Sequence, residues 1–138
     1  MVKLSLSQAK VGDTFPPVSY TVYPEIVKRY GEVNGVSQPT SGSSYWVPPG
    51  MLAHDIVWIA FKYFDITGVL LAGLELRFER LVPDSGTITV RDARIEEIFF
   101  HDGEQYTIAS FVTVNEQGAV LCRSKITCVS KAAKAKAE

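Results

Sequence analysis

The stretch that decides the fold is residues 50–64, which read GMLAHDIVWIAFKYF. This segment is apolar at nearly every position, and its polar members are His54, Asp55 and Lys62. A helix with apolar side chains nearly all round is expected to be buried on most of its sides. Gly68 ends the pattern, so we predict a central helix that packs beneath a second layer of structure.

Downstream of this helix the sequence alternates between apolar and polar residues, which is the period of β-strands. The alternation changes phase near Asp92, which indicates a β-bulge, and residues 101–103 have the composition of a hairpin turn. We therefore expect a meander of four strands, over residues 70–78, 87–100, 106–114 and 120–129.

Upstream, a strand that ends near Tyr23 leads into an amphipathic helix from Pro24 to Asn34. Residues 36–49 then lack periodicity and are rich in Ser, Gly and Pro, so we expect a long loop. Loops of this length in compact domains are usually functional or disordered. The loop is therefore a first place to look for a site.

An apolar helix packed against a curled antiparallel sheet is a two-layer α+β solution that buries one face of each element. This arrangement is the hot-dog fold, in which the sheet wraps around the central helix. The 138 residues, 46% hydrophobic and 21% charged, fit one domain. We place that domain at residues 1–130 and a flexible tail, rich in lysine and alanine, at residues 131–138.

The composition argues against several classes of protein. A net charge of −1 with interspersed signs gives no footprint for nucleic acid or an anionic membrane. The sequence has no apolar stretch of about 20 residues and no signal-peptide pattern at its start, so we expect a cytoplasmic location. Cys122 and Cys128 lie about 20 Å apart on one predicted strand and cannot pair. No metal-ligand spacing or phosphate-binding glycine loop occurs in the sequence, so neither a metal nor a cofactor is expected.

Four stretches of the sequence resemble motifs of the MaoC-like hot-dog family, of the R-specific enoyl-CoA hydratase type. Residues 34–41 (NGVSQPTS) resemble its S-G-D-x-N-P-x-H motif, and residues 49–52 (PGML) resemble its H-G-M-L motif. Residues 78–87 resemble its F-x-x-P-V-x-P-G-D-x-L motif, and Gln117 and Gly118 fit its last turn. These stretches follow the family's order along nearly the whole chain. The resemblance implies the hot-dog fold and an acyl-CoA-type thioester as ligand.

The same alignment replaces the family's acid–base residues. Val36 stands at the position of the catalytic Asp, Ser41 at that of the catalytic His, Gln38 at that of the Asn, and Pro49 at the His of H-G-M-L. Hydration of an enoyl thioester needs a base to activate water and an acid to protonate the α-carbon. Val36 and Ser41 supply neither group, so the family's standard mechanism is not carried over.

The resemblance leaves a binding site in place at the start of the central helix. In this fold the first N–H groups of that helix point at the thioester carbonyl, which assigns this part to Gly50 and Met51. Polar residues of the preceding loop would orient the thioester or a water molecule. The predicted substrate-binding residues are Asn34, Gln38, Ser41, Tyr45, Gly50 and Met51.

His54 and Asp55 are the predicted catalytic residues, because they are an ionisable pair in the first turns of an apolar helix. Other hot-dog enzymes use a carboxylate on this helix to drive hydrolysis, which gives Asp55 a role as a base. The alternative is that the two residues form a hydrogen-bonded structural pair, or lie at an interface between subunits.

Three functions stay open from the sequence. The first is a divergent hydratase or dehydratase, a lyase that acts on acyl-CoA or a related thioester. The second is a catalytically deficient subunit that pairs with an active hot-dog partner, and the third is an acyl-CoA thioesterase that uses Asp55. In each case we expect a homodimer or a heterodimer formed by edge pairing, because a strand meander leaves a long unprotected sheet edge.

Overall fold

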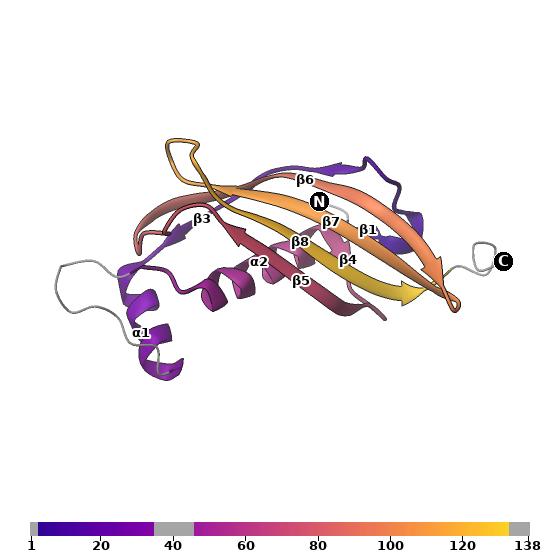
Figure 1. Cartoon of the computed structure of the whole chain (residues 1–138), viewed down its shortest axis with the longest axis horizontal. Helices are drawn as coiled ribbons and strands as arrows, with labels where there is room; N and C mark the ends of the chain where they lie inside the picture. The colour runs from indigo at the N-terminus through magenta and orange to yellow at the C-terminus, as the bar shows by residue number, and fades with distance from the viewer. Residues whose placement is uncertain (1–2, 35–45, 133–138) are drawn as a thin grey trace.

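The computed structural model describes residues 3–34 and 46–132 (Figure 1). Its helices are the 3-10 turn η1 (Leu6–Gln8), α1 (Pro24–Asn34) and α2 (Pro49–Tyr63). Its strands are β1 (Leu4–Ser5), β2 (Thr14–Phe15), β3 (Val18–Val22), β4 (Phe64–Asp65), β5 (Leu70–Phe78), β6 (Gly86–His101), β7 (Glu104–Val114) and β8 (Val120–Lys131). The two predicted helices and the long predicted strands are all present, with ends that agree to within a few residues.

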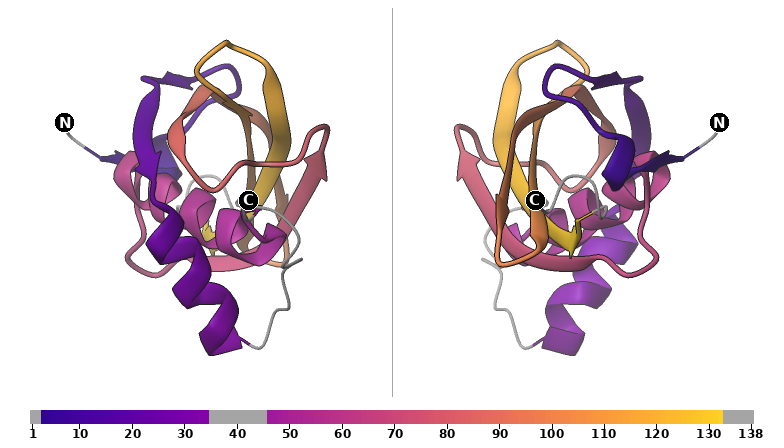
Figure 2. Two further views of the ribbon diagram at one scale, coloured as in Figure 1. Left: turned by 90° about the vertical axis from the view of Figure 1, so that its left-hand side faces the viewer. Right: turned by 90° about the vertical axis from the view of Figure 1, so that its right-hand side faces the viewer.

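Six strands form one antiparallel sheet in the order β2-β6-β7-β8-β5, and β3 also pairs with β6. The sheet curls around α2, so that the helix lies along its concave side (Figure 2). A separate short ladder joins β1 and β4 in parallel. The α+β hot-dog architecture predicted from the sequence is confirmed.

The prediction that residues 70–78 form the first strand of a four-strand meander is wrong. β5 pairs with β8 and not with β6. The turn-like residues after β5 do not close a hairpin, because they pair with the segment before α2. Val82 accepts a hydrogen bond from the Val47 amide (2.7 Å), and Pro83 forms a bridge with Trp46. β5 therefore lies at the edge of the sheet, and one side of its backbone has no strand partner within residues 3–34 and 46–132.

Two local features of β6 follow its sequence. Its pairing with β7 shifts register between Arg91 and Arg94, and Asp92 there has a φ of 53°. At the hairpin, Asp102 and Gly103 have φ values of 49° and 76°, as in a two-residue type I′ turn. Asp and Gly tolerate this left-handed backbone better than most residues. The predicted bulge and the predicted hairpin are both confirmed.

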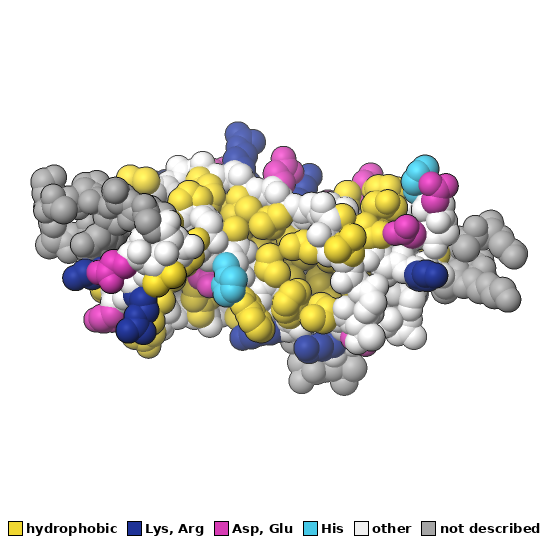
Figure 3. Space-filling model, turned by 90° about the horizontal axis from the view of Figure 1, so that it is seen from below, with side chains coloured by type: hydrophobic (Ala, Val, Ile, Leu, Met, Phe, Trp, Pro, Cys, Tyr) yellow, Lys and Arg dark blue, Asp and Glu magenta, His cyan; other side chains and the backbone are white. Residues whose placement is uncertain are grey.

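The core lies between α2 and the concave face of the sheet. The buried face of α2 comprises Leu52, Ile56, Ile59, Ala60 and Tyr63. It packs with buried side chains of β6, β7 and β8, which include Ile88, Val90, Ile95, Phe111, Leu121 and Ile126. No described element covers the opposite face: Trp58 is 57% exposed, and hydrophobic side chains gather on the underside of the molecule (Figure 3). The expectation that this helix is buried on most sides is therefore wrong for the single chain.

Two further expectations concern the cysteines and membrane spans. Cys122 and Cys128 are buried free thiols, as predicted, and burial raises the pKa of Cys128 to about 11. Within the described part of the chain, no helix has the length and apolar content needed to cross a membrane.

Candidate functional site

The central helix α2 begins without a capping side chain. Pro48 is its N-cap and makes no side-chain hydrogen bond, Pro49 is its first residue, and its first turn contains no acidic residue. The Pro48 carbonyl accepts hydrogen bonds from the Met51 amide (3.0 Å) and the Leu52 amide (3.3 Å). The Gly50 amide has no such partner in the described ranges. Within residues 3–34 and 46–132, no acidic side chain caps the positive end of the helix dipole, which favours an anion or a developing oxyanion.

The predicted donors to the thioester carbonyl are the Gly50 and Met51 amides, and their hydrogen bonding differs. The Met51 amide is engaged within the turn, so Gly50 is the better donor to an external carbonyl. Gly50 also packs against Tyr30 of α1, because a Cβ built at Gly50 would lie 2.7 Å from the Tyr30 hydroxyl oxygen. Tyr30 does not stand out in the sequence, because it is an ordinary member of the amphipathic helix. No spacing pattern in the sequence relates residue 30 to residue 50.

Asp55 lies one turn after Met51, and its side chain is 27% exposed. Burial raises the pKa of the Asp55 carboxyl, and the nearby Tyr20 hydroxyl and His54 oppose part of that rise. Burial, together with the Asp55 carboxylate, in turn raises the pKa of Tyr20, so the phenol stays protonated at neutral pH. The Tyr20 hydroxyl is buried and makes no hydrogen bond of ordinary geometry within the described residues. The Tyr20 hydroxyl therefore acts on Asp55 as a nearby dipole.

A groove of about 390 Å³ runs beside Asp55 and Tyr20. Its other polar members are Lys3 and Lys62, and its remaining walls are the apolar side chains Val18, Trp58, Ile59 and Phe61. A partly buried carboxyl with a raised pKa in a mainly apolar groove is a candidate general base. Asp55 and Tyr20 are therefore the titratable pair that the fold brings together.

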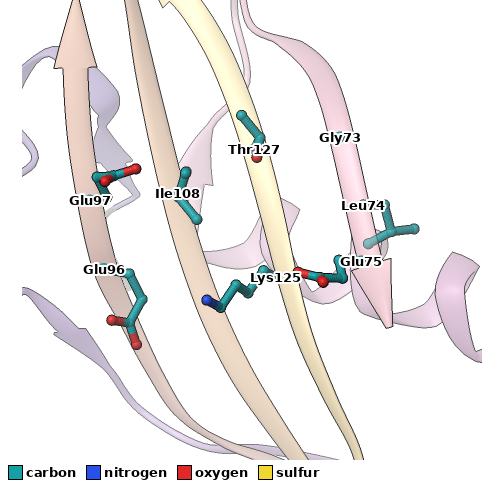
Figure 4. Close-up of a pocket in the computed structure, with 8 residues that line it drawn as sticks. All are labelled: Gly73, Leu74, Glu75, Glu96, Glu97, Ile108, Lys125 and Thr127. Atoms are coloured by element: carbon teal, nitrogen blue, oxygen red, sulfur yellow. The ribbon is translucent and has the colours of Figure 1, made fainter. Parts of the chain in front are cut away.

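A larger hollow of about 590 Å³ lies on the outer face of the sheet (Figure 4). Charged side chains from three strands border it, among them Glu75, Glu96 and Lys125. The hollow is on the opposite side of the sheet from α2, so it shares no residue with the start of the central helix. This hollow is larger than the groove at Asp55. The groove is nevertheless the better candidate site, because it contains a partly buried carboxyl with a raised pKa.

The predicted catalytic residues His54 and Asp55 lie close together but differ in exposure. The His54 side chain is 66% exposed and is not part of the groove wall. Its Nε2 accepts a hydrogen bond from the indole Nε1 of Trp58 (2.8 Å), and its Nδ1 lies 3.8 Å from an Asp55 carboxylate oxygen. A nitrogen that accepts a hydrogen bond carries no proton, so this arrangement suits a neutral imidazole.

The remaining predicted residues lie in or after α1. Asn34 ends this helix, and its side-chain amide donates a hydrogen bond to the Tyr30 carbonyl (2.9 Å). Gln38, Ser41 and Tyr45 lie outside the described residues. Among the residues that are described, no three His, Cys, Asp or Glu side chains come together in a way that could hold a metal ion.

No family model and no curated protein matches this sequence. Solved structures do match. The MaoC-like dehydratase from Rhodospirillum rubrum superposes with a TM-score of 0.75 at 16% identity, over 94% of this chain and 98% of that chain. The chain has the MaoC-like hot-dog fold.

Two further structures share this MaoC-like hot-dog fold. The monoamine oxidase regulatory protein of an Archaeoglobus species superposes with a TM-score of 0.76 at 14% identity, over 95% of this chain and 96% of that chain. The truncated HadBC (3R-hydroxyacyl-ACP dehydratase) complex from Mycobacterium tuberculosis gives a TM-score of 0.70 at 14% identity, over 91% of this chain and 100% of that chain.

Proposed function

We propose that this chain binds an acyl-CoA-type thioester with its carbonyl oxygen at the Gly50 amide. The observation that carries the proposal is the uncapped start of α2, where the Gly50 amide has no hydrogen-bond partner in the described ranges. An N–H group at the positive end of a helix stabilises the negative charge that develops on a carbonyl oxygen. Dehydratases among the proteins of similar fold support a thioester as the ligand.

The reaction that fits this site is a divergent hydration or dehydration, with Asp55 as the base. Asp55 follows Gly50 along α2 with an axial rise of about 7.5 Å, at 1.5 Å per residue. The carboxylate takes a proton from water as the oxygen attacks the β-carbon. The same carboxyl, now protonated, returns that proton to the α-carbon, so that the addition of water is balanced.

We also propose that the chain assembles with a second hot-dog subunit through the open edge at β5. A long unpaired strand edge supports this pairing, and one protein of similar fold is itself a complex of subunits. The chain is then either the active subunit or, as the second candidate, a catalytically deficient one. The second candidate is favoured by Val36 and Ser41, which replace the acid–base pair of the family that the sequence resembles.

Turnover and binding by the purified chain test these alternatives. Slow hydration of crotonyl-CoA supports the divergent hydratase, and release of CoA from a saturated acyl-CoA supports a thioesterase that uses Asp55. Calorimetric binding of both thioesters without turnover supports the catalytically deficient subunit. Binding of neither thioester would reject the proposed site.

The Gly50→Val variant tests the place of binding. The larger side chain would crowd the carbonyl position and meet the Tyr30 hydroxyl, so we expect weaker thioester binding in a folded protein. The control is Ala53→Val, which adds bulk to the same helix one turn from its start. Equal affinity of Gly50→Val and wild type by calorimetry would remove Gly50 from the site.

A further inference from the structure

One face of α2 changes in chemistry along the groove beside Asp55. Asp55, Trp58, Ile59 and Lys62 all border this groove. They are spaced at i, i+3, i+4 and i+7 within one helix, so their side chains lie on the same face of it. The axial rise from Asp55 to Lys62 is about 10.5 Å, at 1.5 Å per residue. The groove therefore has a carboxyl at one end, apolar walls along its length and an ammonium group at the other end.

The fold brings a second ammonium group to the Lys62 end of the groove. Lys3 immediately precedes β1, and Lys62 lies shortly before β4. The parallel ladder of these two strands pairs Leu4 with Phe64, which holds both lysines beside the end of α2. Both lysines border the groove, and Asp55 is the one acidic residue among the described residues that line it.

Neither lysine has a close ion pair among residues 3–34 and 46–132. A hydrogen bond from the Thr67 amide (3.0 Å) lowers the pKa of Asp65, and the Lys3 ammonium adds a smaller effect. A lysine in the last turn of a helix also complements the helix dipole, which accounts for Lys62 but not for Lys3. Two ammonium groups at one end of a mainly apolar groove favour a ligand with an anionic group there.

We infer that the acyl chain of the thioester ends in a carboxylate that Lys3 and Lys62 bind, which makes the substrate class the ω-carboxyacyl thioesters. This inference rests on the proposed function, which places the thioester carbonyl at the Gly50 amide and the reacting carbons beside Asp55. The rest of the acyl chain then follows the apolar walls of the groove toward the two lysines. A chain that ended in a methyl group would leave both ammonium groups without a partner.

The length of the groove sets the length of the acyl chain. An extended chain needs roughly eight bonds of about 1.5 Å each to span the distance from Asp55 to Lys62, which corresponds to an acyl group of roughly ten carbons. The carboxylate at the end of the chain would then lie about 10 Å from the Asp55 carboxyl. This separation is about one Debye length at 0.1 M salt, so repulsion between the two groups is largely screened.

Two matched thioesters test the inference. They are the 2-decenoyl thioester of CoA and the 2-decenedioyl monothioester of CoA, which differ only in that the last carbon is a methyl group in the first and a carboxylate in the second. The wild-type chain should bind the second about three- to tenfold more tightly in calorimetry, because exposed ion pairs make modest contributions. Raising the salt concentration should shrink this preference.

Lysine variants test where the carboxylate binds. Lys62→Met removes the charge and nearly keeps the length of the side chain, so it should weaken binding of the decenedioyl thioester about twofold or more and leave binding of the decenoyl thioester unchanged. Lys3→Met should have the same effect, and the double variant should lose the preference. Lys28→Met is the matched control, because it makes the same change at an exposed position of α1 that does not border the groove.

Three results would overturn the inference. They are equal affinity of the wild type for the two thioesters, a preference that survives in the double variant, and an equal loss of affinity for both thioesters in the lysine variants. The last result would mean that the lysines bind the phosphates of CoA, which both thioesters share. If Lys62→Met loses its circular dichroism spectrum, Lys3→Met and the salt dependence decide.

Crotonyl-CoA separates a failure of this inference from a failure of the proposed function. A chain that binds crotonyl-CoA but does not prefer the decenedioyl thioester rejects the carboxylate and leaves the proposed ligand in place. A chain that binds none of the three thioesters rejects the proposed function and this inference with it.

Discussion

The two flanks of α2 differ in chemistry although they belong to one helix. The flank toward β3 carries Asp55 beside the buried hydroxyl of Tyr20. The flank toward β5 carries apolar side chains such as Val57, which borders a hollow with Leu71. The face between the flanks is buried against the sheet. An amphipathic helix usually has one buried face and one solvent-exposed face. In α2 the buried face lies between a flank that carries the ionisable Asp55 and a flank of apolar side chains.

The two flanks differ in chemistry because they lie beside different parts of the molecule. The Asp55 carboxylate lies near the protonated phenol of Tyr20. The phenol stabilises the carboxylate and so offsets part of the cost of burying it. The flank toward β5 meets an open sheet edge, where further apolar surface can be buried only by another subunit. We therefore expect substitutions on the first flank to change chemistry, and those on the second to change assembly.

The largest expected effect is loss of turnover on removal of the Asp55 carboxylate. Because general acid–base catalysis contributes about 10²–10⁴-fold, Asp55→Asn should lower any hydration rate on crotonyl-CoA by that factor. His54→Ala should have a much smaller effect, since His54 faces outward. Asp102→Asn is the matched control, because it makes the same change at an exposed hairpin. Rapid hydration that is insensitive to Asp55→Asn would place the chemistry elsewhere.

Stability against pH gives an independent measure of Asp55→Asn. The pKa of Asp55 is raised in the folded protein, so its ionisation opposes folding at neutral pH. The free energy of unfolding of Asp55→Asn relative to wild type should therefore increase as the pH rises through the raised pKa. The gain should vanish in acid, where the carboxyl is protonated in both states. A large loss of stability at neutral pH would support a structural role for Asp55.

The buried face of α2 is expected to control stability. Ile56 is fully buried against the sheet, so Ile56→Ala should lower the free energy of unfolding by about 2–5 kcal/mol. Val57 is half-buried, and Val57→Ala should cost about 1 kcal/mol. Urea unfolding at one protein concentration measures both values. Equal costs at the two positions would contradict the division of the helix into a buried face and an apolar flank.

Sequence periodicity predicted the elements of this fold well and their neighbours less well. The alternation at residues 70–78 identified β5, but alternation cannot say which strand lies beside it. The turn residues after β5 suggested a hairpin, whereas Val82 bonds to Val47, a partner more than thirty residues earlier in the chain. Contacts of that range depend on the assembled fold, and no local pattern encodes them.

The sequence could suggest only some residues of the candidate site, for the same reason. Gly50 and Asp55 could be proposed from the sequence because both belong to one helix whose composition is unusual, and their roles remain predictions. Tyr20 and Tyr30 were missed, since each is an ordinary member of its own element and reaches the site only through packing of that element against α2. The contributions of Gln38 and its neighbours in the loop remain predictions.

A smaller effect is expected from Tyr20→Phe, which leaves the Asp55 carboxylate in place. The Tyr20 hydroxyl lowers the pKa of Asp55, so its removal should raise that pKa further. A base works only when unprotonated, and the acid limb of the rate profile should therefore move to higher pH. Tyr23→Phe, which makes the same change at an exposed position just after β3, should leave the profile unchanged. If the acid limb of the Tyr20→Phe profile does not move, the Tyr20 hydroxyl does not influence the ionisation of Asp55.

The smallest expected effect tests the contact between Gly50 and Tyr30. Alanine is favoured over glycine within a helix by roughly 0.5–1 kcal/mol, so Gly50→Ala should stabilise α2 if the new methyl group had space. In the wild-type background that group would meet the Tyr30 hydroxyl oxygen at 2.7 Å, whereas the ring carbon behind the hydroxyl is 3.9 Å away. Tyr30→Phe removes the hydroxyl and leaves an ordinary contact. Gly50→Ala should therefore raise the free energy of unfolding in the Tyr30→Phe background and fail to do so in the wild type. Additive effects in this double-mutant cycle, measured by urea unfolding, would show that Tyr30 does not rest on the start of α2 in solution.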